Sequence, residues 1–507
     1  MSNDNAVAET EEVKLPLFPL IAFGIGSMVG AGIFGIPSQM AGNAAPGPLL
    51  IGWLITGIGM LMLAFVFQSL ATTRPDITGG VYGYAREGLG NFGGFMSAWS
   101  YWLSAWAGNL SYIAFFTSAL GGFAVFSGLM QGDSVSIAGL IFGLVCLWLI
   151  HFLILAGIRT AAFVNTIVTA VKIIPIVVFI ICAAVAFKVG FFTADFWGNV
   201  VQVGPEGEEA GLGPVMAQVS HMMLVTVWVF IGIEGASVYS TRAKKSSDVA
   251  KATVIAFLTV LALLVFVNVL SYGLMAQPEL ANLADPSMGG AMAAAVGPWG
   301  AGFINIAVLI SVAGAMLTWV MLASEILFVP AADHNIMAAF GKMNKKGSPT
   351  VSLWVTNIVS SIVYITMILG FASSYTDLIT IAASLIIPCY VISAIYQIIQ
   401  TSHGRNEAEG VKSSKGYRMC VGVIATVYTV WLLWAGGIGL LFLNGLLWLI
   451  GSPLYYKGRK EQYPDQPAFQ GKDKIFLGVA IAFTVLLIIW VIVFKGDFIS
   501  AMFWNGL

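Results

Sequence analysis

The stretch GSMVGAGIF at residues 26–34 and the stretch FIGIEGAS at residues 230–237 decide the fold. Each places glycines inside an apolar segment, and the second lies five apolar segments after the first. Transporters built from inverted repeats carry glycine-interrupted segments at corresponding positions, where freed backbone groups hold the ligand near the membrane midplane. Because five segments per half force opposite orientations, the pair predicts an inverted repeat of segments 1–5 and 6–10.

The second stretch also carries a carboxylate inside the apolar segment. An ionisable side chain there is costly and is a functional hypothesis by default. Glycines alone could serve only close helix packing, but together with Glu234 they favour a binding site. Amides at Gly30, Ala31 and Gly32 could hold a substrate carboxylate at a half-helix N-terminus. Carbonyls at the second break could accept from an α-ammonium.

Composition makes lipid the main solvent of this chain. Of the 507 residues, 58% are hydrophobic and 9% charged, with a mean hydropathy of +0.90, unlike a soluble domain. The net charge of -1 averages over two aqueous faces and indicates no nucleic-acid partner. The polar, acidic start of the chain lacks the pattern of a cleavable signal peptide. No nucleophile and base pairing, phosphate loop or metal-ligand cluster is apparent, so we expect neither enzymatic activity nor a cofactor.

Thirteen apolar segments approach the roughly 20 residues that a spanning helix needs. If the N-terminus is cytoplasmic, nearly all Lys and Arg fall in the inner connections, as the positive-inside rule requires. This predicts an all-α, multi-pass protein of the cell inner membrane. Residues 1–15 would form a cytoplasmic tail, 16–400 the transport core and 401–507 additional spans. The segments lie near 16–38, 48–70, 92–126, 135–157, 163–188, 216–240, 251–275, 298–330, 350–371, 377–400, 418–434, 436–455 and 474–495, with a re-entrant hairpin as the alternative for the short eleventh and twelfth.

The third, sixth and eighth segments supply further candidate walls for a site. At about 100° per residue, five residues of the third segment share one face that is small and polar in its middle. An aromatic face attracts a cation by about 0.5 to 2 kcal/mol, and Trp228 and Trp319 lie near mid-span, although packing is the usual role of a membrane tryptophan. The shared face consists of Tyr101, Ala105, Gly108, Asn109 and Tyr112.

Ordered motifs along nearly the whole chain resemble the basic amino acid/polyamine antiporters of the amino acid/polyamine/organocation superfamily, most closely the arginine:ornithine antiporters. The resemblance implies a five-plus-five inverted-repeat transporter bundle with discontinuous helices 1 and 6. It also allows a homodimer. The motifs are GSMVGAGIF, GGVYGYAREGLG at 79–90, YWLSAWAGN at 101–109, LVTVWVFIGIEGAS at 224–237, STRAKKSSDVAKAT at 240–253 and the stretch 319–333.

The same resemblance assigns roles by matching positions in relatives that exchange arginine for agmatine. The head group of the amino acid is held at positions matching Gly30, Ala31, Gly32 and Ile231. The side chain is surrounded by positions matching Ser104, Ala105, Asn109, Tyr112 and Trp319. Gating or a proton-sensitive inner step is implied for Trp228, Tyr101, Glu234 and Tyr82. This chain departs from those relatives at Ala31, where they carry Ser, and at Glu325, where they carry Gln, which weakens a transfer of agmatine specificity.

Lys172 lies inside the fifth apolar segment. A fixed ammonium in a membrane could replace a coupling sodium ion, and a lysine in this helix does so in other superfamily members. We therefore predict a sodium-substituting or proton-responsive role. The alternative is an ion pair with Glu325 or another acid.

The leading functional hypothesis is exchange of a basic amino acid, arginine, for its metabolic product ornithine by alternating access. The expected partners are basic amino acids and the lipid bilayer. Alternatives are lysine for cadaverine, histidine for histamine, or proton-coupled uptake of one amino acid. A transporter-like membrane sensor is a hypothesis of another class, which the short inner connections disfavour.

Overall fold

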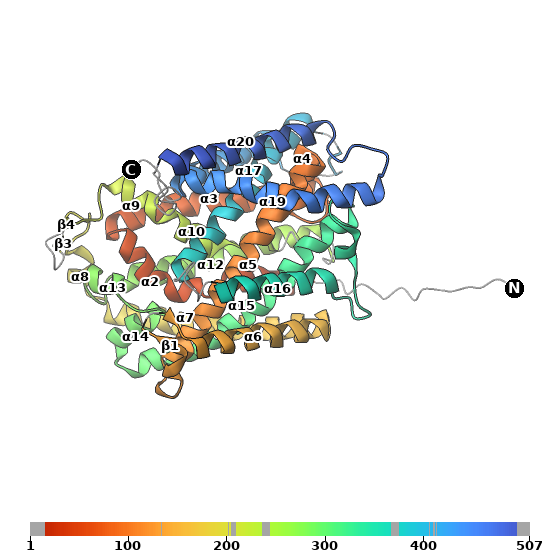
Figure 1. The fold of residues 1–507 in the computed structure, drawn as a ribbon. Coiled ribbons are helices and arrows are strands. Elements are labelled where there is room, and N and C mark those ends of the chain that lie inside the picture. The colour runs from red at the N-terminus through yellow and green to blue at the C-terminus, as the bar shows by residue number, and fades with distance from the viewer. Residues whose placement is uncertain are drawn as a thin grey trace.

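The structure is a computed structural model that describes residues 16–132, 134–200, 202–203, 209–235, 244–366, 375–404, 406–408, 411 and 413–493. Helices dominate this part of the chain, and Figure 1 shows the long ones running side by side as a bundle. The strands of the described part form two short antiparallel ribbons outside the bundle. They pair β1 (Met130–Gln131) with β2 (Ser134–Val135), and β3 (Gln202–Val203) with β4 (Glu209–Ala210).

Nine helices of the described part are long and apolar enough to cross a membrane, and a tenth span is formed if the bent pair α1 and α2 is counted as one. The all-α class is therefore confirmed, while the total of thirteen spans stays a prediction. The helices are α1 (Leu17–Met28), α2 (Gly32–Asn43), α3 (Pro46–Thr73), α4 (Val81–Leu89), α5 (Asn91–Gly121), η1 (Ala124–Leu129), α6 (Ile137–Leu155), α7 (Ile158–Ala186), α8 (Val189–Thr193), α9 (Val215–His221), α10 (Met223–Phe230), α12 (Ser246–Ser271), α13 (Gln277–Ala281), α14 (Ser287–Val296), α15 (Trp299–Ala332), η3 (Ala338–Gly341), α16 (Thr350–Thr366), α17 (Tyr375–His403), α18 (Lys415–Ala435), α19 (Ile438–Gln462) and α20 (Lys472–Val493).

Three predicted segments can be compared closely with the helices. The segment 92–126 is too long at its end, because α5 stops at Gly121 and residues 124–129 form the 3-10 helix η1. In contrast, α18 and α19 are separate helices, each meeting the length and composition of a span, which favours two crossings over one re-entrant hairpin. Gly437 joins them with φ +101, a conformation that favours glycine. The tail 1–15 and residues 494–507 lie outside the described residues.

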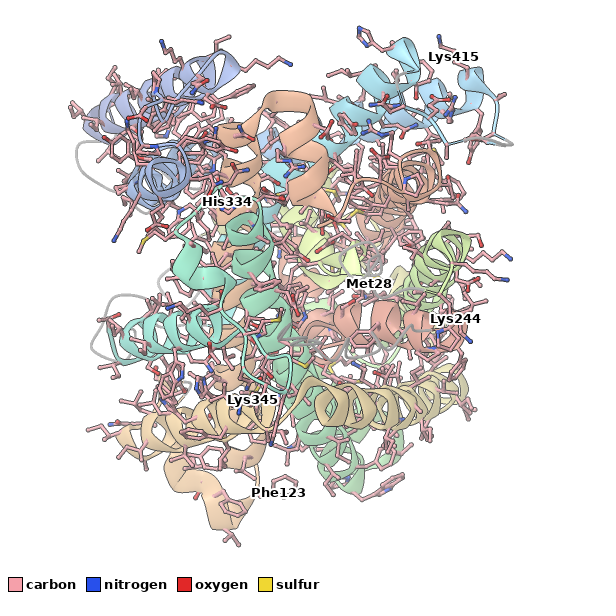
Figure 2. All side chains as sticks on the ribbon, turned by 90° about the vertical axis from the view of Figure 1, so that its right-hand side faces the viewer. Met28, Phe123, Lys244, His334, Lys345 and Lys415 are labelled. Atoms are coloured by element: carbon pink, nitrogen blue, oxygen red, sulfur yellow. The ribbon has the colours of Figure 1, made fainter. Side chains whose placement is uncertain are left out.

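Connections predicted to lie on the same side of the membrane meet at the same end of the bundle. Figure 2 looks along the bundle from the end that carries the predicted inner connections, with Lys244, Lys345 and Lys415 labelled. The short helices α8, α13 and α14, from predicted outer connections, lie together at the other end in Figure 1. The predicted inner and outer connections thus lie at opposite ends of the bundle, as spans that alternate in direction require.

Helices differ in how much of their surface the protein covers. In the most apolar window of α15, 78% of the residues are buried, against 11% in α20. Exposed side chains of α20 are large and apolar, for example Ile481 and Ile488. Such a surface suits lipid rather than water. The interior of the bundle is therefore built around α15, α5 and α17, with α20 at the periphery.

A buried carboxylate attaches the peripheral helix α20 to the core. Asp473, in its first turn, accepts a hydrogen bond from the backbone N–H of Phe92 at the start of α5, at 2.9 Å. Its second oxygen accepts from the Tyr455 hydroxyl of α19, also at 2.9 Å. A carboxylate at the first N–H groups of a helix satisfies donors that have no partner within the helix. A residue 381 positions later thus caps α5.

Candidate functional site

The first span is broken where its glycines lie. α1 ends at Met28 and α2 begins at Gly32, with a bend of 41° between them. A Cβ atom at Gly30 would lie 2.5 Å from the Tyr112 hydroxyl oxygen, and one at Gly32 would lie 2.9 Å from Val229 Cγ1. Both positions therefore need glycine because neighbouring side chains leave no room. The break opens the N-terminus of α2, whose first N–H groups lack partners within the helix.

The sixth segment breaks directly against the first. α10 ends at Phe230, Ile231 leaves the helical conformation, and Gly232 follows with φ +108, which glycine adopts without strain. The Ser27 hydroxyl donates to the Gly232 carbonyl at 2.9 Å. A Cβ at Gly232 would also lie 2.8 Å from Ser27 Cβ. Breaks that are about two hundred residues apart in sequence are thus in contact.

Aromatic rings close the space beside these breaks. Tyr112 on α5 and Trp228 on α10 have ring centroids 5.6 Å apart. Trp228 Nε1 would lie 3.0 Å from a Cβ at Gly32, and its ring carbon Cζ3 would lie 3.2 Å from one at Gly108. Trp228 therefore packs between α2 and α5.

The remaining predicted contact residues come from α5 and α15. Trp319 Nε1 donates to the Ser27 carbonyl at 3.1 Å, beside the first break. Asn109 is 1% exposed, and neither of its amide atoms has a hydrogen-bond partner in the described part of the chain. Ser104, by contrast, donates to the Ala382 carbonyl at 2.7 Å. Because an unpaired buried amide costs about 1–3 kcal/mol, Asn109 is the better candidate for a ligand contact. The other predicted contact residues, Ala31, Ala105 and Ile231, are buried.

Glu234 belongs to a hydrogen-bonded group that includes α17. The Tyr390 hydroxyl donates to Glu234 Oε2 at 2.7 Å, and the Gly232 N–H donates to the same oxygen at 3.2 Å. Tyr101 on α5 lies close enough to interact electrostatically with this carboxylate. The structure thus brings together two of the predicted gating residues, Tyr101 and Glu234, and adds Tyr390 to them.

Lys172 is buried against the end of α1. Its Nζ atom donates to the Gly26 carbonyl at 2.9 Å and to the Val29 carbonyl in a shorter contact. These carbonyls belong to the last turn of a half-helix, where a cation is favoured by the helix dipole. Among the described residues its hydrogen-bond partners are carbonyls rather than Glu325, so the ion-pair alternative with that residue is not what the structure shows.

Tyr82 lies in a second polar group, at the inner end of α15. Its hydroxyl donates to Asp333 Oδ2 at 3.0 Å and accepts from Asn335 Nδ2 at 2.8 Å. Arg86, one turn along α4, forms an ion pair with the same carboxylate. Burial and then the neighbouring Asp333 carboxylate raise the pKa of Tyr82. This group, which we call the inner latch, joins α4 to the end of α15.

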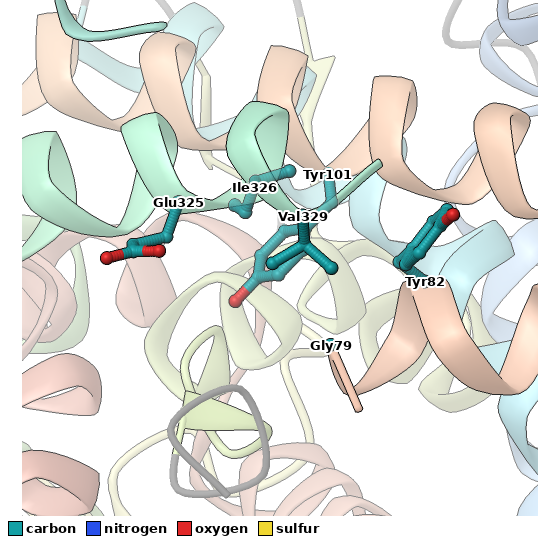
Figure 3. A pocket seen from close by; sticks show the side chains of 6 residues that line it. All are labelled: Gly79, Tyr82, Tyr101, Glu325, Ile326 and Val329. Atoms are coloured by element: carbon teal, nitrogen blue, oxygen red, sulfur yellow. The ribbon is translucent and has the colours of Figure 1, made fainter. Parts of the chain in front are cut away.

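A small cavity separates the inner latch from the Glu234 group. Figure 3 shows Tyr101 and Val329 in its middle, with Tyr82 on one side and Glu325 on the other. Glu325 therefore lines the same cavity as the predicted gating residues Tyr82 and Tyr101. The lining residues are Gly79, Tyr82, Tyr101, Glu325, Ile326 and Val329.

Comparison with known proteins identifies the family. A family model described as amino acid permease matches residues 15–495, nearly the whole chain. The chain belongs to the amino acid permease family. Membership makes it a multi-pass membrane transporter and not an enzyme, and it confirms the family that the motifs predicted.

Named relatives cover the permease almost completely. An arginine/ornithine antiporter of Pseudomonas aeruginosa is 46% identical over 484 residues, which are 94% of this chain and 96% of the relative. A putative arginine/ornithine antiporter of Escherichia coli is 38% identical over 94% of this chain and 98% of its own length. An arginine/agmatine antiporter of Chlamydia caviae is 35% identical over 92% of this chain and 94% of its own length.

Sequence reasoning about the permease missed Tyr390 and most of the inner latch. Tyr390 carries a hydroxyl in the middle of an apolar span, a signal that could have singled it out in the way that Glu234 was. Arg86, Asp333 and Asn335 lie at helix ends in the predicted inner connections, where charged residues are ordinary. Only the hydrogen bond and the ion pair between α4 and the end of α15 give them a common role.

Proposed function

We propose that this permease exchanges arginine for ornithine by alternating access, in the cytoplasmic membrane, with its N-terminus inside and spans 1–5 and 6–10 as inverted repeats. The observation that carries the proposal is the contact between the two glycine breaks, through Ser27 and Gly232. It gathers unpaired helix ends of both halves at one point, the arrangement by which transporters hold an amino acid. The printed names of the relatives at 46% and 38% identity supply the substrate pair.

Backbone groups at the two breaks would hold the part of the substrate that all amino acids share. The N-terminus of α2 would bind the carboxylate, since its N–H groups and dipole favour an anion. The carbonyls that end α10 would accept from the α-ammonium. The residues proposed for this role are Gly30, Ala31, Gly32 and Ile231.

Side chains from α5 and α15 would surround the cationic end. Asn109 has an amide oxygen to accept from it, and the Trp319 and Tyr112 rings offer faces for a cation. Ser104 would line the space without donating, because its hydroxyl is engaged by Ala382. The small side chain of Ala105 would leave space for the substrate.

The proposed gating groups lie in order along the inner path. Trp228 would close over the substrate, the Glu234 group with Tyr101 would seal the next level, and Tyr82 with the inner latch would close the cytoplasmic end. Lys172 would fix the end of α1 without a sodium ion, since its ammonium already occupies two carbonyls there.

The membrane potential does not oppose an exchange of two substrates that carry the same net charge. Arginine and ornithine carry the same net charge at neutral pH, so their exchange moves no charge across the membrane. Exchange for a diamine would move charge, which costs or yields about 2.3 kcal/mol per 100 mV.

The test is uptake of labelled arginine by purified protein in liposomes loaded with ornithine, lysine, histidine, agmatine or no substrate. We expect uptake that needs internal ornithine, does not need sodium and does not respond to an imposed voltage. Equal uptake into empty liposomes would disprove obligatory exchange and indicate uniport or proton symport.

A further inference from the structure

Buried polar groups also gather on the second half of the broken span, away from the break itself. Asp285, in the connection between α13 and α14, and Gln39, on α2, approach the same point above Gly35. A Cβ atom at Gly35 would lie 3.0 Å from Asp285 Oδ1, 3.0 Å from Gln39 Nε2 and 3.1 Å from Phe115 Cε2. A carboxylate, an amide and an aromatic ring thus converge where glycine leaves space.

The protein leaves several of these polar atoms without a partner, although the backbone N–H of Ser287 donates to the Asp285 carboxyl group. Gln39 is 8% exposed, and both of its amide atoms, together with Asp285 Oδ1, are buried without a hydrogen-bond partner in the described part of the chain. Burial raises the pKa of Asp285 to about 7, and no Lys or Arg among the described residues forms an ion pair with it. Because buried polar groups are nearly always paired, unpaired ones that meet at one point indicate a ligand.

The segment that carries the carboxylate is held in place by serine hydroxyls that bind backbone groups. The Ser118 hydroxyl of α5 donates to the Asp285 carbonyl at 2.8 Å. The Ser287 hydroxyl donates to the Gly35 carbonyl at 3.0 Å and accepts from the Ser38 N–H at 3.2 Å. These contacts fix the connection on α2, so the position of the carboxylate is set by the fold.

The point above Gly35 lies between the break in span 1 and the end of the bundle that carries α13 and α14. Gly35 follows Gly30 by five residues, about 7 Å along a helix. On α5, Phe115 follows Tyr112 by three residues, on the same helix face. The Asp285 carboxylate is therefore displaced from the break by about one to two helical turns, toward the end of the bundle where α13 and α14 lie in Figure 1.

We propose that Asp285 and Gln39 form an outer subsite that binds the cationic side-chain end of a basic amino acid before it reaches the break. The inference rests on the proposed function and on the topology that places α13 and α14 outside. The carboxylate would accept charge-assisted hydrogen bonds from an ammonium or guanidinium group. The Gln39 amide oxygen would accept another, and the Phe115 ring would offer an apolar and cation-attracting face.

The test compares Asp285→Asn with Glu279→Gln. Glu279 is an exposed carboxylate in α13, just before the connection that carries Asp285, so both variants remove one charge at this end of the bundle and only one changes the subsite. Gly35→Ala is a second variant, which fills the point without changing any charge. Arginine uptake would be measured in right-side-out and in inside-out vesicles loaded with ornithine.

For Asp285→Asn we expect the external KM for arginine to rise by about fivefold or more, with a maximum rate within about twofold of wild type. In Asp285→Asn, the KM for arginine at the inner face should stay unchanged. Gly35→Ala should also raise the external KM, whereas Glu279→Gln should keep the external KM of wild type. An unchanged external KM in Asp285→Asn, or an equal rise at both faces, would overturn the subsite while leaving the exchange function intact. A wild-type protein without exchange would overturn both proposals.

Discussion

Single side chains in the broken region are constrained by close neighbours, which makes substitutions there informative. The break before α2 is crowded, while the C-terminal end of α2 is open. A Cβ at Gly30 would meet the Tyr112 ring at 2.5 to 3.0 Å, whereas one at Gly42 would meet nothing within 4 Å. The same change can therefore be made twice on one span with opposite consequences.

We expect Gly30→Ala to reduce arginine exchange by about tenfold or more, because overpacking costs about 1–3 kcal/mol and displaces Tyr112 from the site. Gly42→Ala should keep wild-type exchange. Removing the hydroxyl in Gly30→Ala/Tyr112→Phe should restore part of the activity, since that oxygen makes the closest contact. Initial uptake rates in liposomes, with equal amounts of monodisperse protein, would decide; equal activity of the two alanine variants would contradict the steric argument.

A second substitution tests whether Lys172 holds the end of α1. Lys172→Met leaves the Gly26 and Val29 carbonyls without their donor, and each buried unsatisfied group costs about 1–3 kcal/mol. We therefore expect a lower melting temperature of the purified protein and loss of exchange that sodium does not restore. Lys188→Met, at the exposed outer end of the same helix region, should melt like wild type. Rescue of Lys172→Met by sodium would instead reveal a sodium site that the ammonium had occupied.

Helices of this permease act through the few polar groups that they bring to a neighbour. α17 presents Tyr390 to Glu234, and α4 presents Tyr82 and Arg86 to the end of α15. Both contacts join segments that are far apart in the sequence. Gating should therefore respond to the loss of one hydroxyl or one charge more than to changes on the lipid-facing surface.

For α17, we expect Tyr390→Phe to lower the maximum exchange rate by about tenfold while changing the KM for arginine by less than about threefold. A hydrogen bond to a charged group is worth about 1.5–3 kcal/mol, and this one lies in the proposed gate rather than at the substrate. Tyr417→Phe, on the exposed face of α18, is the matched control. A rise in KM with an unchanged maximum rate would place Tyr390 in the binding site instead.

The sequence predicted the elements well, because each depends on local composition. Within the described residues, every predicted apolar segment overlaps a helix or one of the bent and broken pairs, and both breaks lie at the predicted glycines. What it could not predict depends on distant residues meeting. The hydrogen bond from Tyr390 to Glu234 joins residues 156 positions apart, and the inner latch joins residues about 250 positions apart. Neither pair has a local pattern, and the same holds for Asp285 and Gln39.

A transporter that works by alternating access must open at one end while the other is closed, and the inner latch is a polar contact at the end of the bundle that we propose to be cytoplasmic. It joins α4, near the start of the first half, to the end of α15, in the second half. Releasing it should therefore favour states open to the cytoplasm.

We expect Asp333→Asn to increase the access of water-soluble reagents to the cavity beneath Tyr101. Val329→Cys, introduced on a background without the four native cysteines, would report this access, because Val329 lines the cavity. The rate of modification by a charged thiol reagent in inside-out vesicles should rise by about threefold or more, as expected when a few tenths to about 1 kcal/mol of closing energy is lost. An unchanged rate of modification after the Asp333→Asn substitution would show that the latch does not hold the inner end closed.

The cap that Asp473 places on α5 links the last described helix to one made much earlier. Ribosomes deliver α5 to the membrane about 380 residues before the carboxylate that completes its first turn. During that interval the start of α5 lacks this hydrogen-bond acceptor, and it gains one only when synthesis has reached α20. A chain truncated before α20 would therefore leave α5 without its cap, which gives a helix far from the proposed substrate site a part in completing the core.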